Sequence, residues 1–202
     1  RYGRLALVFG LCAAIPVIAS TIHAVASGWL PLGDDGVIAV RSFDVFSTHP
    51  PLLGQYSQSS QVIGKDVLSP GPMLYWLLAV PVRISASAPA ITVGIVNTAA
   101  ICAIVLLARR RGGLALMSLT AGALALMCAS WNASTLHDTW NPAAALLPFT
   151  LLIFLAWSLA CGEYRLLPLT AIVASFTVQA QLTYIVPVAA LLLVALGFLT
   201  TA

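Results

Sequence analysis

The stretch that decides the fold is Gly28-Trp29-Leu30-Pro31-Leu32-Gly33-Asp34-Asp35-Gly36, which follows an apolar run that begins at Leu5. It opens a polar segment, residues 28–89, that holds four of the chain's six acidic residues. Two adjacent carboxylates, placed where an apolar run of membrane-spanning length ends, predict a boundary between membrane and water. We therefore place the candidate functional site at this boundary.

The composition around this stretch is that of an integral membrane protein. Of the 202 residues, 60% are hydrophobic and 7% are charged, whereas soluble domains carry about 25% charged residues. Apolar runs of about 20 residues can cross the hydrocarbon core as helices, which satisfy their backbone hydrogen bonds internally. The predicted fold class is all-α: one polytopic transmembrane helical bundle over residues 1–202. The four cysteines are scattered without CxxC spacing, which favours packing residues over a disulfide or metal set.

Six spans are predicted, at about residues 5–26, 90–108, 114–133, 143–160, 166–183 and 187–201. The loop 28–89 lies between the first two spans. Within it, residues 36–46 predict an amphipathic helix, and residues 73–84 predict an interfacial helix that is too short to cross. Gly112-Gly113 predicts the turn between the second and third spans.

The cationic residues predict the orientation of the chain. Cytoplasmic segments carry an excess of Lys and Arg. With loop 28–89 outside, six basic residues lie in the cytoplasm (Arg1, Arg4, Arg109, Arg110, Arg111 and Arg165) and three lie outside (Arg41, Lys65 and Arg83). Loop 28–89, with the candidate functional site, is thus predicted on the extracytoplasmic side of the membrane. The net charge of +3 reflects this topology and predicts no nucleic-acid partner.

Three predicted extracytoplasmic segments carry polar residues that membrane packing does not require. They are Asp34 and Asp35, then Asp138 and Asn141, and then Gln179, Gln181 and Tyr184. Each set has a structural alternative: Asp and Asn are favoured helix caps, and glutamines within a span can hydrogen-bond a neighbouring helix. Because all three sets are predicted to lie on the same side of the membrane, a shared functional site is favoured.

A carboxylate at this depth suits sugar transfer from a lipid-phosphate donor, whose tail stays in the bilayer. Such transfer needs a general base for the acceptor hydroxyl and a group that neutralises the departing phosphate. Asp34 is the predicted base. Asp35 would orient it, position the acceptor, or bind a divalent cation (Mg, Mn or Ca) together with Asp34 through oxygen ligands. Candidate substrate contacts are Arg41, Lys65 or Arg83 for the phosphate, and His49 and Tyr56, which are more commonly solvated or structural in a loop.

The layout resembles the GT-C glycosyltransferases, multi-spanning enzymes that use polyprenyl-phosphate sugars. The resemblance rests on the Asp motif after the first span, on Pro70-Gly71-Pro72-Met73-Leu74-Tyr75-Trp76 before an apolar helix, and on the Arg109-Arg110-Arg111 run. The chain is most similar to the N-terminal module of the protein O-mannosyltransferase and aminoarabinose-transferase branch. It is also similar to large actinobacterial membrane proteins with a cell-wall role.

The resemblance implies an inverting transferase with a polyprenyl-phosphate sugar donor and a glycan, lipid or protein acceptor in the cell envelope. It also implies the cytoplasmic (inner) membrane of a bacterium as the location. It assigns the base to Asp34 and, less directly, to Asp35. Asp138 and Asn141-Pro142 match an element of the family's next outer loop. The segment 179–184 stands where the family often has a polar motif with a lysine, and that lysine is absent here.

Two other classes stay open. In a transporter or flippase-like carrier, Gln179 and Gln181 would line a substrate path, although no inverted repeat is visible between the halves. The third class is a non-catalytic membrane subunit. A single outer cavity that brings Asp34 and Asp35 together with Asp138 and Gln181 would favour the enzyme, whereas dispersal of these residues would count against it.

Overall fold

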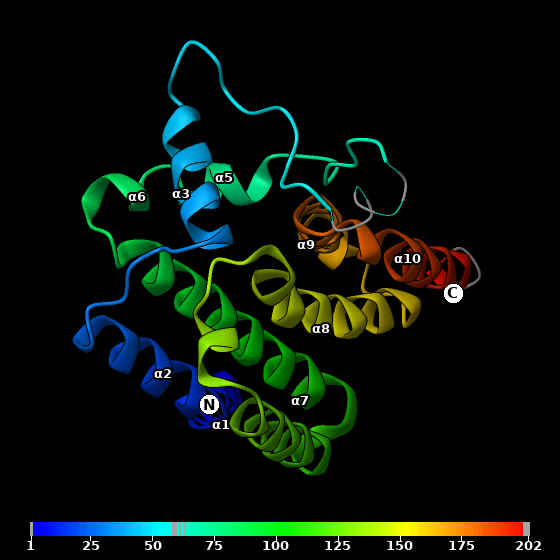
Figure 1. The fold of residues 1–202 in the computed structure, drawn as a ribbon. Coiled ribbons are helices and arrows are strands. Elements are labelled where there is room, and N and C mark those ends of the chain that lie inside the picture. Colours follow the sequence, from blue (N-terminus) through cyan, green and yellow to red (C-terminus); the bar gives the residue numbers. More distant parts are fainter. Residues whose placement is uncertain (1, 58–59, 61, 63, 200–202) are drawn as a thin grey trace.

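The computed structural model describes residues 2–57, 60, 62 and 64–199. These residues form helices joined by turns and loops, and no β-strand occurs among them, which confirms the predicted all-α class. The bundle seen in Figure 1 consists of α1 (Tyr2–Ala13), α2 (Ile15–Ala26), α7 (Ala88–Ser130), α8 (Asn141–Ala160), α9 (Leu167–Ala180) and α10 (Ile185–Leu199). Beside it lie α3 (Asp34–Asp44), α5 (Met73–Leu78) and α6 (Pro81–Ile84).

In the part of the chain that the structure describes, three helices are long and apolar enough to cross a membrane, which indicates a membrane protein. They are α7, α8 and the stretch Leu182–Leu199, which includes α10. Helices α1 and α2 add a fourth candidate only as one broken span, because they are bent by 52°. The span predicted at residues 5–26 is therefore not straight. Pro16, in the first turn of α2, accounts for the break, since its ring clashes with the carbonyl of Cys12 in a continuous helix.

Helix α7 extends over 43 residues but consists of two arms. Gly112 (φ −132°, ψ 22°) and Gly113 (φ 66°, ψ −153°) depart from helical geometry, and glycine adopts the positive φ of Gly113 without strain. The chain reverses at this pair, as Figure 1 shows. The two arms thus stand where the sequence predicts spans at residues 90–108 and 114–133.

The C-terminal helices differ from the predicted spans at 166–183 and 187–201. Helix α9 has only 14 residues, because the extended backbone of Gln181 (φ −144°, ψ 122°) ends it. A 3-10 turn, Leu182–Tyr184, then leads directly into α10. The last two residues of the predicted sixth span lie outside the described residues.

Helices α1 and α2 pack closely against the first arm of α7. A Cβ atom on Gly10 would lie 2.8 Å from the Cα of Cys102, so a glycine is needed for this approach of the two backbones. Apolar side chains fill the bundle interior, the largest fully buried ones being Val17, Ile101, Ile104, Met117, Leu147, Leu152, Leu155 and Leu159. In a membrane such a core is stabilised by close van der Waals packing, because lipid tails are as apolar as these side chains.

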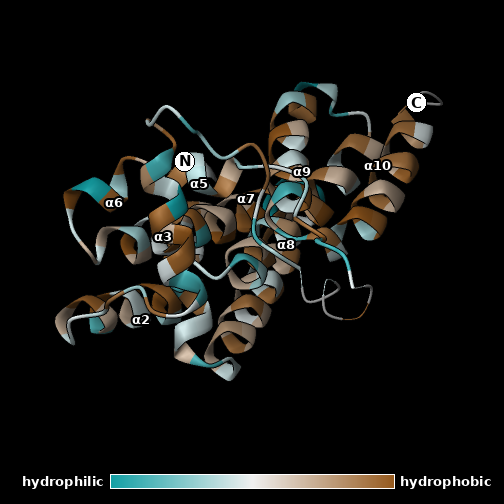
Figure 2. Ribbon diagram, turned by 45° about the horizontal axis from the view of Figure 1, so that its top comes forward, coloured by the Kyte–Doolittle hydropathy of each residue, from teal (hydrophilic) through white to brown (hydrophobic). Residues whose placement is uncertain are grey.

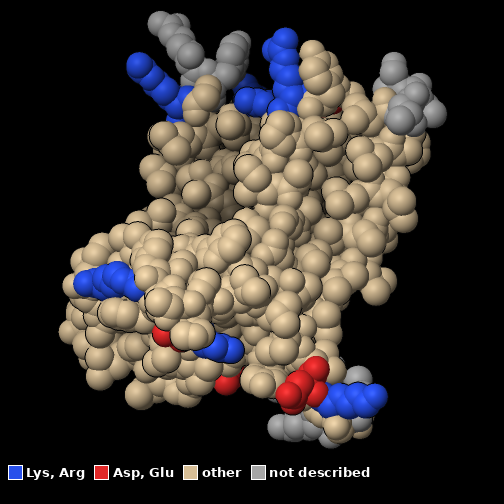
Figure 3. Space-filling model, turned by 90° about the horizontal axis from the view of Figure 1, so that it is seen from above, with Lys and Arg blue, Asp and Glu red and all other residues tan. Residues whose placement is uncertain are grey.

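Charged residues lie at two opposite ends of the molecule. Figure 2 shows hydrophobic residues along α8 and α10 and hydrophilic ones mostly in connecting segments and at helix ends. In Figure 3, a broad uncharged band separates the charged residues at opposite edges. At the arginine end, Glu163 pairs with Arg111 and lies 3.9 Å from Arg110 (Oε2 to Nη1). The other end, the aspartate end, carries Asp34 and Asp35. An apolar band between polar ends is what a hydrocarbon layer requires.

Helices α5 and α6 form the short apolar segment Met73–Ile84, which is below the length of a candidate span. Arg83 fastens this segment to the end of α3. Its guanidinium donates to the carbonyls of Ser42 (3.4 Å) and Phe43, and it lies 4.5 Å from the centre of the Phe43 ring and 4.8 Å from that of Phe46. A helix C-terminus attracts cations because its last carbonyls are unpaired. Arg83, predicted as a substrate contact, is therefore engaged within the fold.

Candidate functional site

The first turn of α3 places the two aspartates that the sequence singles out. The helix begins at Asp34, two residues earlier than predicted, after Gly33 with a φ of 57°. Carboxylates in the first turn are favourable because the N-terminal N–H groups carry partial positive charge. One turn further along, Ile38 is completely buried and packs with Leu74 of α5, which fixes the rotation of α3.

A cavity of about 350 Å³ lies beside Asp34 at the aspartate end. It is formed by segments far apart in the sequence: α3, residues 55–57, the start of α8 and the junction of α9 with α10. Its lining residues are Asp34, Gln55, Tyr56, Ser57, Trp140, Asn141, Pro142, Gln181 and Thr183. We call it the aspartate cavity. It brings together Asp34, Tyr56, Asn141 and Gln181 from the predicted site.

Hydrogen bonds between amide side chains shape the wall of this cavity. Asn141 is 5% exposed and its Nδ2 donates to the carbonyl of Ala180 (2.9 Å) and to Oε1 of Gln181 (2.7 Å). This pair of bonds joins the start of α8 to the end of α9. Gln55 accepts from the hydroxyl of Tyr75 through Oε1 (3.2 Å). The bonded oxygens leave the amide nitrogens of Gln55 and Gln181 as donors for a bound molecule.

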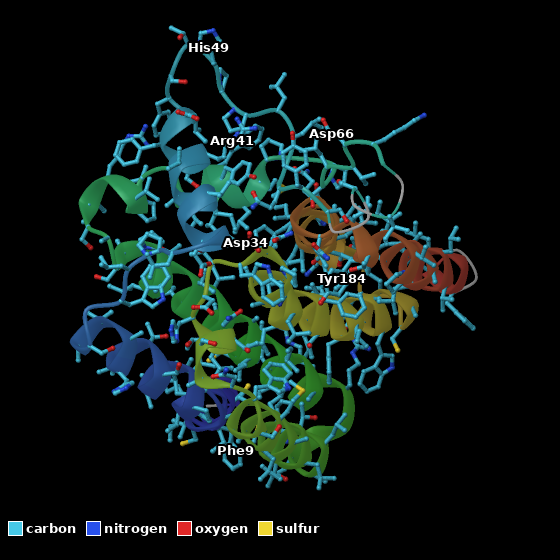
Figure 4. All side chains as sticks on the ribbon, viewed as in Figure 1. Phe9, Asp34, Arg41, His49, Asp66 and Tyr184 are labelled. Atoms are coloured by element: carbon cyan, nitrogen blue, oxygen red, sulfur yellow. The ribbon has the colours of Figure 1, made fainter. Side chains whose placement is uncertain are left out.

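Asp34 is the one acidic residue in the described lining of the cavity. Its side chain is exposed and makes no hydrogen bond or ion pair within the described part of the chain. Arg41 lies seven residues further along α3, on the same face of the helix and about 10 Å along its axis. Figure 4 shows both side chains on α3, and the charge of Arg41 acts on Tyr75, which contacts Gln55. Arg41, predicted as a substrate contact, is nevertheless absent from the described lining of the cavity.

Asp35 has a different environment from Asp34. Its Oδ1 accepts from the hydroxyl of Thr139 (2.7 Å), and its carboxylate also accepts from the backbone N–H of Trp140. Burial raises the pKa of Asp35 above its usual value; the hydrogen bond from Thr139 opposes this shift, and the charge of Asp138 adds to it. Asp35 is absent from the described lining, so the pair consists of one open carboxylate and one that binds the neighbouring segment.

A divalent cation shared by Asp34 and Asp35 stays a prediction. Within the described residues, no group of three or more His, Cys, Asp or Glu side chains is arranged to hold a metal ion. A cation in the cavity would find Asp34 as its carboxylate ligand, with amide and hydroxyl oxygens around it, because Asp35 is directed toward Thr139. Oxygen ligands of this kind suit Mg²⁺ or Ca²⁺ in type, although Ca²⁺ takes six to eight of them.

The remaining predicted contacts lie outside the cavity's described lining. Asp138 accepts from the indole Nε1 of Trp29 at 3.4 Å. The ring of Tyr184 packs on Phe149, with their centres 4.8 Å apart. His49 is exposed at a loop tip far from Asp34 in Figure 4.

Gln179 acts in packing rather than in the cavity. Its Oε1 accepts from the backbone N–H of Met73 at the start of α5 (3.3 Å), and its Nε2 donates to Ser175 (2.8 Å). A Cβ atom on Gly71 would overlap this glutamine side chain, so glycine at that position lets the loop cross α9. These contacts match the structural alternative, in which the Gln179 amide hydrogen-bonds a neighbouring segment of the protein.

The comparisons with known proteins add no relative: no protein-family model, curated protein or solved structure matches the chain. Function is therefore inferred from the geometry of the aspartate end.

Sequence patterns did not predict the bonds that anchor residues 131–140, the connection between α7 and α8. His137 is 6% exposed and its Nδ1 lies 2.7 Å from the hydroxyl of Ser20 in α2. The Ser20 hydroxyl donates to the carbonyl of Ala133 (2.6 Å), so the Nδ1–H of His137 donates to Ser20. Asn97 of α7 adds a bond to the carbonyl of Leu136 (3.0 Å). In the sequence, the available signal was a serine within an apolar run (Ser20) and a histidine in the segment between two predicted spans (His137).

The stability of the protein is expected to fall when the pH drops below about 6.5, the usual pKa of histidine. Burial lowers the pKa of His137, while the charge of Asp138 partly opposes this shift and His23 adds to it. The unfolded chain then takes up a proton at a higher pH than the folded one, which favours unfolding as pH falls through this window. Unfolding midpoints measured in detergent between about pH 5 and pH 8 test this, with His137→Asn as the variant that should lose this component. An unchanged pH profile in His137→Asn would contradict it.

Proposed function

We propose that the protein is a membrane glycosyltransferase that moves a sugar from a polyprenyl-phosphate donor to an acceptor hydroxyl in the aspartate cavity. The observation that carries the proposal is the carboxylate of Asp34, which has no hydrogen-bond or ion-pair partner among the described residues and lies among groups suited to a sugar. Amides and hydroxyls both donate and accept hydrogen bonds, as sugar hydroxyls require. Tyr56 and Trp140, 57% and 42% exposed, add aromatic faces on which a sugar ring can pack.

A second cavity supports a lipid-linked donor. An apolar cavity of about 520 Å³ lies between α5, α7, α8 and α9, with Trp76, Pro148 and Phe176 among its lining residues. The two cavities are lined by different parts of the same helices: Pro148 and Phe176 line the apolar one, and the start of α8 and the residue that ends α9 line the aspartate cavity. A polyprenyl chain can occupy such an apolar space while its phosphate reaches the polar end, as an amphipathic ligand requires.

Asp34 acts as the general base in the proposed reaction. Its carboxylate takes the proton of the acceptor hydroxyl as the hydroxyl oxygen forms a bond to the anomeric carbon. The bond from that carbon to the phosphate oxygen breaks on the opposite face, and its electron pair leaves with polyprenyl phosphate. Arg41 is the proposed counter-charge for the leaving phosphate. One displacement inverts the configuration at the anomeric carbon, in keeping with the implied inverting reaction.

The proposed setting is the bacterial cytoplasmic membrane, with a polytopic GT-C-like module whose aspartate end is extracytoplasmic. The basic run at Arg109, Arg110 and Arg111 favours this orientation by the positive-inside rule. Cys161, exposed in the turn beside Glu163 at the arginine end, offers a test. A membrane-impermeant maleimide should label Cys161 in inverted vesicles and not in right-side-out ones, with the other cysteines replaced by alanine. The reverse labelling would contradict the orientation.

The function is tested in proteoliposomes that contain the full chain. Radiolabelled polyprenyl-phosphate mannose and arabinose are supplied as donors, with an envelope glycan fraction as acceptor. The expected result is label in the acceptor together with release of polyprenyl phosphate. Movement of intact donor across the bilayer without transfer would instead support the carrier. The contacts of Gln179 give the carrier no support, because both ends of its amide are bonded within the fold.

A further inference from the structure

Asp34 and Asp35 are adjacent in the sequence, but their side chains face different parts of the protein. Consecutive residues of an α-helix point about 100° apart, so the two carboxylates cannot share one direction. Asp34 lines the aspartate cavity, and Asp35 faces Thr139. A residue that transfers a proton must reach the substrate. The position of Asp35 instead suits a link between α3 and residues 131–140.

The first turn of α3 has no anchor in its own cap. Gly33 occupies the N-cap position and provides no side-chain hydrogen bond, unlike the Ser, Thr, Asp or Asn preferred there. Asp35, within the first turn, anchors it instead: its carboxylate accepts hydrogen bonds from the hydroxyl of Thr139 and the N–H of Trp140. Thr139 is 1% exposed, so its hydroxyl is held in place by the surrounding protein.

Residues 131–140 give this link a firm support, because they are bonded to three other parts of the bundle. The contacts come from α2 through Ser20, from α7 through Asn97 and from the segment before α3 through Trp29. Trp140, next to Thr139, lines the aspartate cavity together with Asp34. The bond between Asp35 and Thr139 therefore ties the helix that carries Asp34 to the segment that carries Trp140.

We propose that Asp35 is a positioning residue: bonded to Thr139, it fixes the first turn of α3 and directs Asp34 into the cavity. This inference rests on the proposed function of Asp34. It separates the roles of the two aspartates, giving proton transfer to Asp34 and orientation to Asp35. Because the role requires a hydrogen-bond acceptor rather than a charge, asparagine should serve at this position.

Two pairs of variants in the full chain test the proposal through transfer kinetics. Asp35→Asn keeps an oxygen that can accept from Thr139, and Thr139→Ser keeps the hydroxyl donor, so both variants should retain transfer within about fivefold of the unmodified protein. Asp35→Ala and Thr139→Val remove them and should lower kcat about 10- to 100-fold with a smaller change in KM, because a small displacement of Asp34 is costly. If Asp35→Asn is as inactive as Asp35→Ala, Asp35 acts by its charge and the proposal is overturned.

Hydrogen exchange of the α3 backbone, measured without substrate, separates this inference from the proposed function. The amides of residues 35–38 should exchange at least about 10-fold faster in Asp35→Ala and Thr139→Val, and near the normal rate in Asp35→Asn and Thr139→Ser. Unchanged exchange in both disruptive variants would overturn the positioning role whatever the activity. Faster exchange in a protein that transfers no sugar from any donor would keep the link and remove the glycosyltransferase.

Discussion

Replacing Asp34 by asparagine is expected to lower the rate of sugar transfer about 10²- to 10⁴-fold while leaving the fold intact. Asparagine has the shape of aspartate but does not take a proton from the acceptor, and general-base catalysis contributes rate factors of this size. The substitution leaves no protein group unpaired, because Asp34 makes no hydrogen bond or ion pair to other described residues. Initial rates in proteoliposomes and unfolding midpoints in detergent provide the two measurements.

Asp66→Asn is the matched control for Asp34→Asn. Asp66 is an exposed acid of the same polar segment, lies apart from Asp34 in Figure 4, and is absent from the described lining of the cavity. The control should transfer sugar at the normal rate. Full activity in Asp34→Asn would remove Asp34 as the base, and an equal loss in both variants would point to a general effect of charge at this end.

The sequence predicted the all-α class because helix formation depends on local patterns. Apolar runs define helices, and an acidic pair where such a run ends marks a polar boundary. The roles of Asp34 and Asp35 could not be separated in this way. That difference depends on where α3 starts, and Gly33 gives no capping signal, so the predicted start was two residues late.

Long-range contacts account for the predicted substrate contacts that lie outside the aspartate cavity. Arg83 bonds backbone carbonyls about 40 residues away in the sequence, and Gln179 bonds Met73 at a still larger separation. Backbone partners leave no mark in a single sequence, so a polar side chain engaged in packing resembles one that binds a ligand. Pro16 is visible in the sequence as a residue that breaks helices, but the length of the apolar run around it favoured one straight span over the bend that the structure shows.

Gly54→Ala is expected to lower the free energy of unfolding by about 1–3 kcal/mol, the usual cost of forcing extra atoms into a packed region. Gly54 is buried, and its N–H donates to the carbonyl of Ser69 (2.9 Å). A Cβ atom there would lie 2.8 Å from the Cβ of Ser69 and 2.9 Å from the carbonyl oxygen of Gly71. These atoms belong to tightly held backbone or are bonded directly to it, so residue 54 itself must move.

This displacement should impair the site as well as the fold, because Gln55 and Tyr56 follow Gly54 directly and line the aspartate cavity. We expect the KM for the donor to rise in Gly54→Ala along with the loss of stability, since the amide and the ring would no longer face Asp34. Gly122→Ala is the control, because a Cβ at that position of α7 meets no atom within 4 Å. If the two variants unfold at the same temperature and share one KM, residues 54–56 are not held against Ser69 and Gly71, and the cavity lacks the wall on which donor binding depends.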